Sequence, residues 1–78
     1  MTLSTAQTAS LTNLRKAWKS IERAKAKMLR ANGMGWEEQD KAIRSVERAE
    51  RKLLNAQIDA RMKHGSEIGQ KLNALAAS

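Results

Sequence analysis

The stretch LRANGMGWEE, residues 29–38, divides the sequence into two long segments that favour helices. Gly33 follows Asn32 at the end of the first segment, and glycine readily adopts the left-handed conformation that terminates a helix. Glu37 and Glu38 suit the first turn of the next helix, because carboxylates complement the positive end of its dipole. A connection this short places two helices side by side and antiparallel. The predicted elements are a first helix over about 8–31, a turn over 32–35 and a second helix over 36–63.

The N-terminal segment, residues 1–10, is rich in Ser and Thr and carries no charged side chain. We expect it to be partly flexible and to precede a single helical domain over 11–78. Ser4 and Gln7 have the spacing of a capping box, in which each side chain accepts a hydrogen bond from the backbone of the other residue. Ser10 is an alternative N-cap. The two caps leave two starts open for the first helix.

The C-terminal residues predict a short third helix over 67–76. Lys63 and His64 precede Gly65, and cations followed by glycine indicate the end of a helix. Ser66 follows as the predicted N-cap of the third helix. Apolar side chains then recur at helical spacing, at Ile68, Leu72 and Leu75.

The composition favours an all-α fold. Ala, Leu, Lys, Arg, Glu and Gln dominate the 78 residues, and all of them enter helices readily. The chain has no Cys and therefore no disulfide, and a core this small rarely supplies more than about 3–5 kcal/mol of stability. We therefore expect association with a second copy. The predicted architecture is an antiparallel two-helix hairpin with a short third C-terminal helix, which dimerises into a four-helix-bundle-like assembly.

Alanine recurs every seventh residue in both long helices, which favours a close contact between them. The alanine side chain is short, so helices that pack through it approach more closely than helices that pack through leucine. The plainer alternative is that alanine is simply abundant in this sequence. The recurring positions are Ala17, Ala24 and Ala31 in the first helix and Ala42, Ala49 and Ala56 in the second.

Apolar residues of the first helix recur at heptad spacing and form a seam for the second helix, at Leu11, Leu14, Trp18, Ile21 and Met28. Lys25 occupies a position where this pattern calls for an apolar residue, as Glu50 does on the second helix. An antiparallel register that pairs Ala24 with Ala49 brings the two charged residues near each other. We predict that they form an ion pair across the seam and help to determine the register. The alternative is that each aliphatic stem lies along the helix surface while its charged end reaches solvent separately.

The net charge of +7 is concentrated in the first helix. Residues 11–31 hold seven bases and one acid (7 − 1 = +6), whereas residues 36–63 hold seven bases and six acids (7 − 6 = +1). Like charges three and four residues apart destabilise a helix by roughly a few tenths of a kcal/mol per pair. A face of one sign therefore favours an anionic partner, although a solvated surface is the alternative. The predicted contact residues are Arg15, Lys16, Lys19, Arg23, Lys27 and Arg30.

Nucleic acid is the anionic partner that this face favours. Trp18 belongs to the opposite, apolar face and Trp36 opens the second helix, so base stacking is not expected. We predict contacts to the phosphate backbone of DNA or RNA, with little sequence specificity and a strong salt dependence. The expected assembly resembles the Rop family of plasmid RNA-binding modulators in architecture, as a hairpin dimer with a basic helix, and shares no motif with it.

The alternative function is a protein-binding adaptor or inhibitor of phage or plasmid type, acting on a host enzyme that handles nucleic acid. Met34 and Trp36 at the turn are natural anchors for a partner, although we expect Trp36 to pack back over the end of the hairpin instead. The basic face would then bind an acidic protein surface. The predicted partner or dimer contacts are Trp18, Met34, Trp36, Leu54, Ile58 and Met62.

Catalysis and metal binding are not expected. His64 is the single histidine and the chain has no Cys, so no metal motif of paired His or Cys side chains exists. Gly33 and Gly35 are not followed by the Lys-Ser/Thr of a phosphate-binding loop. We therefore predict no enzyme activity, cofactor, metal or small-molecule substrate. No signal peptide is recognisable and no apolar run approaches the ~20 residues of a membrane span, so we expect a cytoplasmic protein without a membrane partner.

Overall fold

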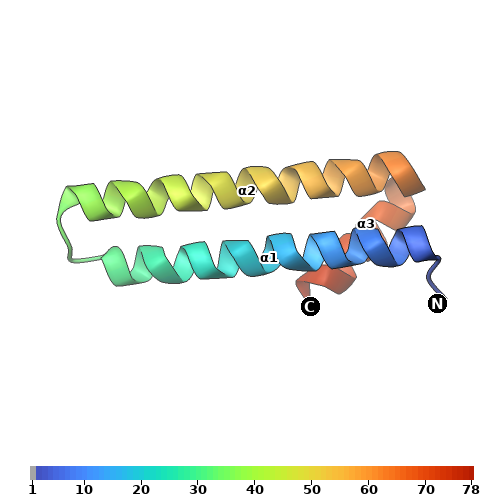
Figure 1. Cartoon of the computed structure of the whole chain (residues 1–78), viewed down its shortest axis with the longest axis horizontal. Coiled ribbons are helices and arrows are strands. Elements are labelled where there is room, and N and C mark those ends of the chain that lie inside the picture. The colour runs from blue at the N-terminus through green and yellow to red at the C-terminus, as the bar shows by residue number, and fades with distance from the viewer. Residues whose placement is uncertain (1) are drawn as a thin grey trace.

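The computed structural model describes residues 2–78, which form three α-helices and no β-strand (Figure 1). α1 spans Thr5–Ala31, α2 spans Trp36–His64 and α3 spans Ser66–Ala77. The prediction of an all-α fold is confirmed. Met1, which belongs to the predicted N-terminal segment, lies outside the described residues.

α1 and α2 lie side by side along the long axis of the molecule and run in opposite directions (Figure 1). Residues 32–35 connect them, and Gly33 there has φ +96°, a left-handed conformation that glycine adopts without steric strain. α3 folds back at the opposite end of the molecule, which we call the open end, and packs against both long helices. The result is an elongated molecule of 48 × 19 × 16 Å.

α1 begins at Thr5, the earlier of the two starts that the candidate caps leave open, so most of the segment expected to be flexible is helical. Ser4 Oγ accepts a hydrogen bond from the Gln7 N–H at 3.1 Å, and Gln7 Oε1 accepts one from the Ser4 N–H at 3.0 Å. This capping box satisfies N–H groups that the first helical turn leaves unpaired. Ser10, the alternative cap, is instead buried inside α1.

A sharp turn at Gly65 separates α2 from α3. Gly65 has φ +89° and is both the C-cap of α2 and the N-cap of α3. Ser66 is therefore the first residue of α3 and not its N-cap, which corrects the sequence prediction. One turn later, Gly69 lies against Arg61, where an added Cβ would sit 2.8 Å from Arg61 Cγ and 3.0 Å from Arg61 Cα. The absence of a side chain at Gly69 lets α3 approach the backbone of α2.

The core extends along the α1–α2 contact, as at Ala24, Val46 and Ala49, and includes α3 at the open end, where the three helices meet. Leu14 of α1 and Leu72 of α3 are the largest fully buried side chains. Beside them, Asn73 Oδ1 accepts hydrogen bonds from the Trp18 indole N–H and from Gln57 Nε2, each at 3.0 Å. Asn73 thereby joins α3 to both long helices. Trp18, predicted as a partner or dimer contact, is partly buried and holds α3 within the single chain.

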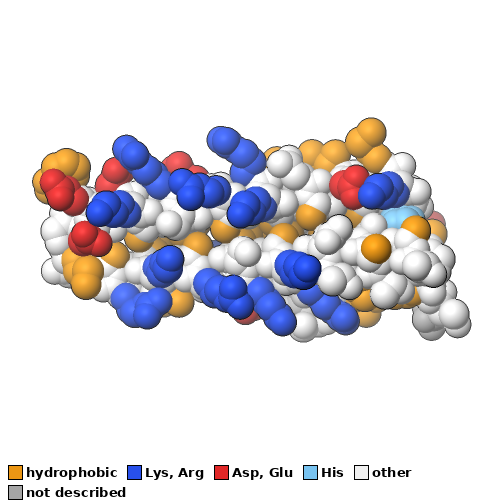
Figure 2. All heavy atoms as spheres, viewed as in Figure 1, with side chains coloured by type: hydrophobic (Ala, Val, Ile, Leu, Met, Phe, Trp, Pro, Cys, Tyr) orange, Lys and Arg blue, Asp and Glu red, His pale blue; other side chains and the backbone are white. Residues whose placement is uncertain are grey.

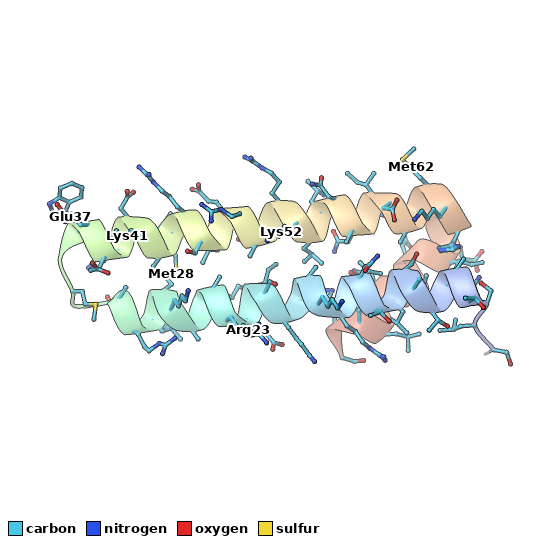
Figure 3. The ribbon with its side chains drawn as sticks, in the orientation of Figure 1. Arg23, Met28, Glu37, Lys41, Lys52 and Met62 are labelled. Atoms are coloured by element: carbon cyan, nitrogen blue, oxygen red, sulfur yellow. The ribbon has the colours of Figure 1, made fainter. Side chains whose placement is uncertain are left out.

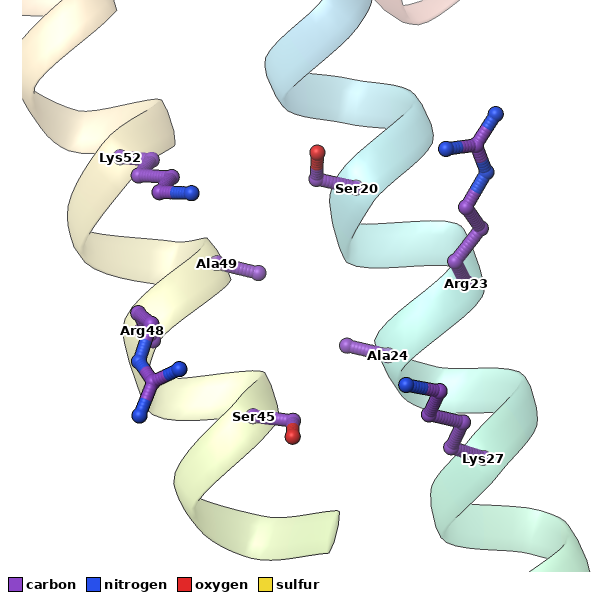
Figure 4. A pocket seen from close by; sticks show the side chains of 8 residues that line it. All are labelled: Ser20, Arg23, Ala24, Lys27, Ser45, Arg48, Ala49 and Lys52. Atoms are coloured by element: carbon purple, nitrogen blue, oxygen red, sulfur yellow. The ribbon is translucent and has the colours of Figure 1, made fainter.

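The alanines that recur every seventh residue lie along the contact between α1 and α2. Ala24 and Ala49 are buried and point toward each other (Figure 4), which is the register that the sequence predicts. Lys25 and Glu50 are both exposed, and none of the ion pairs between described residues involves either of them. The predicted register pair is therefore not formed within the chain, because both side chains turn away from the alanine contact toward solvent.

Candidate functional site

A basic groove runs along one side of the α1–α2 contact (Figure 4). Ala24 and Ala49 form its floor, and each helix adds a serine, an arginine and a lysine to its walls. The side chains of Lys27 and Lys52 each point in the direction of the opposite helix (Figure 4). The lining residues are Ser20, Arg23, Ala24 and Lys27 from α1 and Ser45, Arg48, Ala49 and Lys52 from α2.

The basic groove continues toward the 32–35 turn, because a second hollow shares Lys27 and Ser45 with the first. This part adds a base from each helix and one acid, Glu38, whose Oε1 lies 3.8 Å from Lys41 Nζ. Its floor is again alanine, at Ala31 and Ala42. Over its whole length the groove has the bases Arg23, Lys27 and Arg30 from α1 and Lys41, Arg48 and Lys52 from α2.

The positive charge of the groove is largely unneutralised. Arg23, Lys27, Arg48 and Lys52 take part in none of the ion pairs between residues 2–78. Lys and Arg side chains spread over both helices on this face, whereas acidic side chains gather mostly on α2 and near its ends (Figure 2). Because like charges repel each other in the unliganded groove, a bound anion would relieve that repulsion.

The structure separates the six basic residues that the sequence predicts as contacts. Arg15 and Lys19 line a different hollow, beside the C-terminal end of α3. Lys16 is exposed on α1 and lines neither the basic groove nor the hollow beside α3. The predicted residues that do line the basic groove are Arg23, Lys27 and Arg30.

The net charge of the second helix does not reveal the α2 wall of the groove, which is formed by Lys41, Arg48 and Lys52. Residues 36–63 carry almost as many acids as bases, so their sum is close to zero. The bases nevertheless share one side of α2, and only Glu38 among the acids lines the groove. Charge therefore has to be counted for each face of a helix and not for the whole helix.

An internal repeat is the sequence signal that identifies both walls. Residues 16–31 read KAWKSIERAKAKMLRA and residues 41–56 read KAIRSVERAERKLLNA. The two copies lie on antiparallel helices whose equivalent alanines face each other, so an approximate twofold axis passes through the groove. The equivalent lining residues are Ser20 and Ser45, Arg23 and Arg48, Ala24 and Ala49, and Lys27 and Lys52.

Most of the predicted apolar contacts are exposed. Trp36 is 76% exposed, so the expectation that it packs back over the end of the hairpin is wrong. Met62 is 82% exposed and points away from the rest of the molecule (Figure 3). Met34, Leu54 and Ile58 are exposed as well. Each of these side chains is therefore accessible to a partner.

A second apolar surface lies on the side of the α1–α2 contact opposite the basic groove, and we call it the rear surface. Leu29 is 77% exposed and lines a hollow there with Met28 and Ile43. Lys25 and Glu50 lie on the same side as this hollow. Each directly follows one of the facing alanines, whereas Arg23 and Arg48 of the groove directly precede them. With 3.6 residues per turn, the residues before and after an alanine point to opposite sides of the helix contact. The hydrophobic spacing of the sequence assigns Met28 and Ile43 to the contact between the two long helices, whereas both are exposed, and Leu29 has no predicted role.

His64, the single histidine of the sequence, joins two helices. His64 Nε2 lies 3.0 Å from Ser10 Oγ and thereby joins the end of α2 to α1. Within residues 2–78, no three His, Cys, Asp or Glu side chains are grouped in a way that could hold a metal ion. No helix in that range combines the length and the apolar character needed to cross a membrane.

The chain matches no protein-family model, no curated protein and no solved structure. A helical architecture by itself defines no activity, because the same architecture supports many functions. Function therefore has to be argued from the residues of the basic groove and of the exposed apolar surfaces.

Proposed function

We propose that the protein is a small basic binding module that holds the phosphate backbone of nucleic acid in the basic groove. The observation that carries this proposal is the set of three bases on each side of an alanine floor, with Glu38 as the single acid in the lining. Lys and Arg neutralise phosphates and release their bound counterions, which drives association. The proposal is of a cytoplasmic binding protein and not of an enzyme.

The lining of the groove favours contacts to the backbone over contacts to bases. It has no aromatic side chain on which a base could stack and no Asn or Gln that could read a base edge. Ser20 adds a hydroxyl group that can donate a hydrogen bond to a phosphate oxygen, whereas the Ser45 hydroxyl donates to the Lys41 carbonyl at 3.1 Å. We therefore expect weak sequence specificity and an affinity that falls steeply with salt.

The first prediction concerns the α2 wall of the groove. Replacing Arg48 and Lys52 with Gln removes two phosphate contacts, which should reduce the magnitude of the negative slope of log affinity against log salt by about 1.8 on B-form DNA. Fluorescence anisotropy with a labelled duplex at several salt concentrations measures this slope. Circular dichroism checks that the variant keeps its helices.

A matched control uses Arg44 and Lys63, which lie on α2 and form ion pairs of 3.2 Å with Asp40 and Asp59 outside the groove. Replacing Arg44 and Lys63 with Gln changes the net charge equally, and it should leave the salt slope near that of the native chain. Equal slopes for the two double variants would mean that affinity follows overall charge and not the groove. No binding of the native chain to any nucleic acid at low salt would refute the proposal.

A second copy of the chain is the proposed partner of the rear surface. That surface combines the exposed side chains of Leu29 and Ile43 with two opposite charges, Lys25 and Glu50, that have no ion-pair partner in the described chain. In a twofold dimer through this surface, Lys25 of each chain can meet Glu50 of the other. Charge complementarity thus favours self-association into the proposed four-helix-bundle-like assembly.

The second prediction tests this dimer. Replacing Leu29 and Ile43 with Glu places charge in the proposed interface, so sedimentation at several concentrations should change from dimer to monomer. Met62→Glu alters a side chain outside the rear surface and should leave the dimer intact. A native chain that sediments as a compact monomer at all concentrations would contradict the dimer. Dissociation by Met62→Glu would instead favour the exposed α2 side chains as the interface.

A protein-binding adaptor or inhibitor of phage or plasmid type is the second candidate function. The observation that favours it is the exposure of Met34 and Trp36 at the turn, since exposed aromatic side chains often anchor a protein partner. This candidate gains if the native chain binds no nucleic acid, and then the basic groove would face an acidic protein surface.

A further inference from the structure

We infer that the ligand of the basic groove is a nucleic-acid duplex, with α1 contacting one strand and α2 contacting the other. This inference rests on the proposed function, which by itself leaves single and double strands open. It adds a class of ligand and assigns a separate role to each wall of the groove.

The approximate twofold symmetry of the groove is the first observation that carries this inference. Ser20, Arg23 and Lys27 on α1 are repeated by Ser45, Arg48 and Lys52 on α2, and the two helices are antiparallel (Figure 4). The strands of a duplex are also antiparallel and related by twofold axes perpendicular to the helix. A twofold array of cations can therefore make equivalent contacts to both strands, whereas a single strand offers no matching symmetry.

The repeat of exposed bases is the second observation. Packing between α1 and α2 explains why small residues recur, as at the buried Ala24 and Ala49. Helix packing does not explain why the second copy of the repeat has Arg48 and Lys52 where the first has Arg23 and Lys27. All four side chains are exposed and form no ion pair within the described chain. A ligand that requires cations on both sides of the alanine floor accounts for both recurrences.

The length and charge of the groove fit a short section of duplex. The α1 wall from Ser20 to Arg30 rises about 15 Å at 1.5 Å per residue. A duplex of that length carries about four phosphates on each strand. Each wall offers three bases, so most of the phosphates that face the groove can find a cation.

The absence of a stacking platform in the groove disfavours a single strand. Proteins that bind single strands combine a basic groove with aromatic side chains on which bases stack. Both tryptophans lie elsewhere, since Trp18 is hydrogen-bonded to Asn73 of α3 and Trp36 opens α2. A single strand would therefore gain only phosphate contacts here, and those would come mainly from one wall.

The test compares a DNA duplex longer than the groove with each of its separate strands, using the full chain and anisotropy at several salt concentrations. Six contacts to a duplex predict a log–log salt slope of about −5, and three contacts to a single strand predict about −2. The R23Q/K27Q and R48Q/K52Q double variants should each lower the magnitude of the duplex slope by about 1.8. The R15Q/K19Q control, which has the same charge change on α1 outside the groove, should leave the slope unchanged.

The outcomes separate this inference from the proposed function. Equal slopes for the duplex and the single strands would overturn the duplex and leave backbone binding in place. A loss confined to the R23Q/K27Q variant would also overturn it, because α2 would then contact no strand. Absence of binding to duplex and single strands alike at low salt would remove the proposed function itself.

Discussion

Leu14→Ala is expected to unfold a large share of the molecules at room temperature. Leu14 is completely buried where α1 meets the other two helices. Removing a buried leucine side chain destabilises a protein by about 2–5 kcal/mol, because it removes apolar contacts and leaves a cavity. That loss is comparable to the ~3–5 kcal/mol that a single core of this size rarely exceeds. Urea unfolding followed by circular dichroism measures the change.

Leu29→Ala is the matched control for this prediction, since it makes the same chemical change on the same helix. Leu29 is 77% exposed, so its truncation should change the unfolding free energy of the single chain by less than about 0.5 kcal/mol. The comparison should be made at protein concentrations low enough to keep the chain monomeric. If both variants unfold at the same urea concentration as the native chain, Leu14 cannot belong to the core.

Residues with strong local preferences account for the parts of the fold that the sequence predicts. Gly33 and Gly65 both have positive φ values at the predicted ends of α1 and α2. The start of α3 was harder to predict, because glycine and serine are both good caps and the sequence places Gly65 directly before Ser66. The close packing of α3 against α2 at Gly69 is a tertiary contact, and the local preferences of the residues do not predict it.

The direction of side chains at the helix surface was the least predictable feature of the fold. Trp36 is strongly apolar, which favours packing over the end of the hairpin, yet its side chain is mostly exposed. Lys25 and Glu50 have the predicted register, yet their side chains diverge into solvent. In both cases spacing along the chain predicts the position of the residue but not the direction of its side chain.

Half of the basic groove could be predicted from charge, and the other half required the arrangement of the helices. The excess charge of residues 11–31 indicates the α1 wall, with Arg23 and Lys27. The α2 wall was hidden because acids elsewhere on α2 cancel its bases in the sum. The repeat between 16–31 and 41–56 contains the missing information, since it places equivalent bases on both helices once their antiparallel contact is known.

Ala24→Leu is expected to damage both the fold and the groove, because Ala24 packs directly against Ala49. Helices packed through small side chains lie at the short end of the usual 8–10 Å separation between axes. A leucine here must push α1 and α2 apart, and overpacking of this kind destabilises by about 1–3 kcal/mol. The same displacement changes the spacing between Lys27 and Lys52, so affinity for a duplex should fall as well.

Ala49→Leu should reproduce the effects of Ala24→Leu on stability and on binding, because the approximate twofold axis makes the two positions equivalent. Ala26→Leu is the control, since Ala26 is exposed on α1 and a longer side chain there meets only solvent. Urea unfolding and duplex anisotropy on all three variants check the prediction. If Ala24→Leu destabilises the chain but leaves duplex affinity unchanged, the spacing of the two walls does not determine binding, and each helix would have to contact phosphate independently of the other.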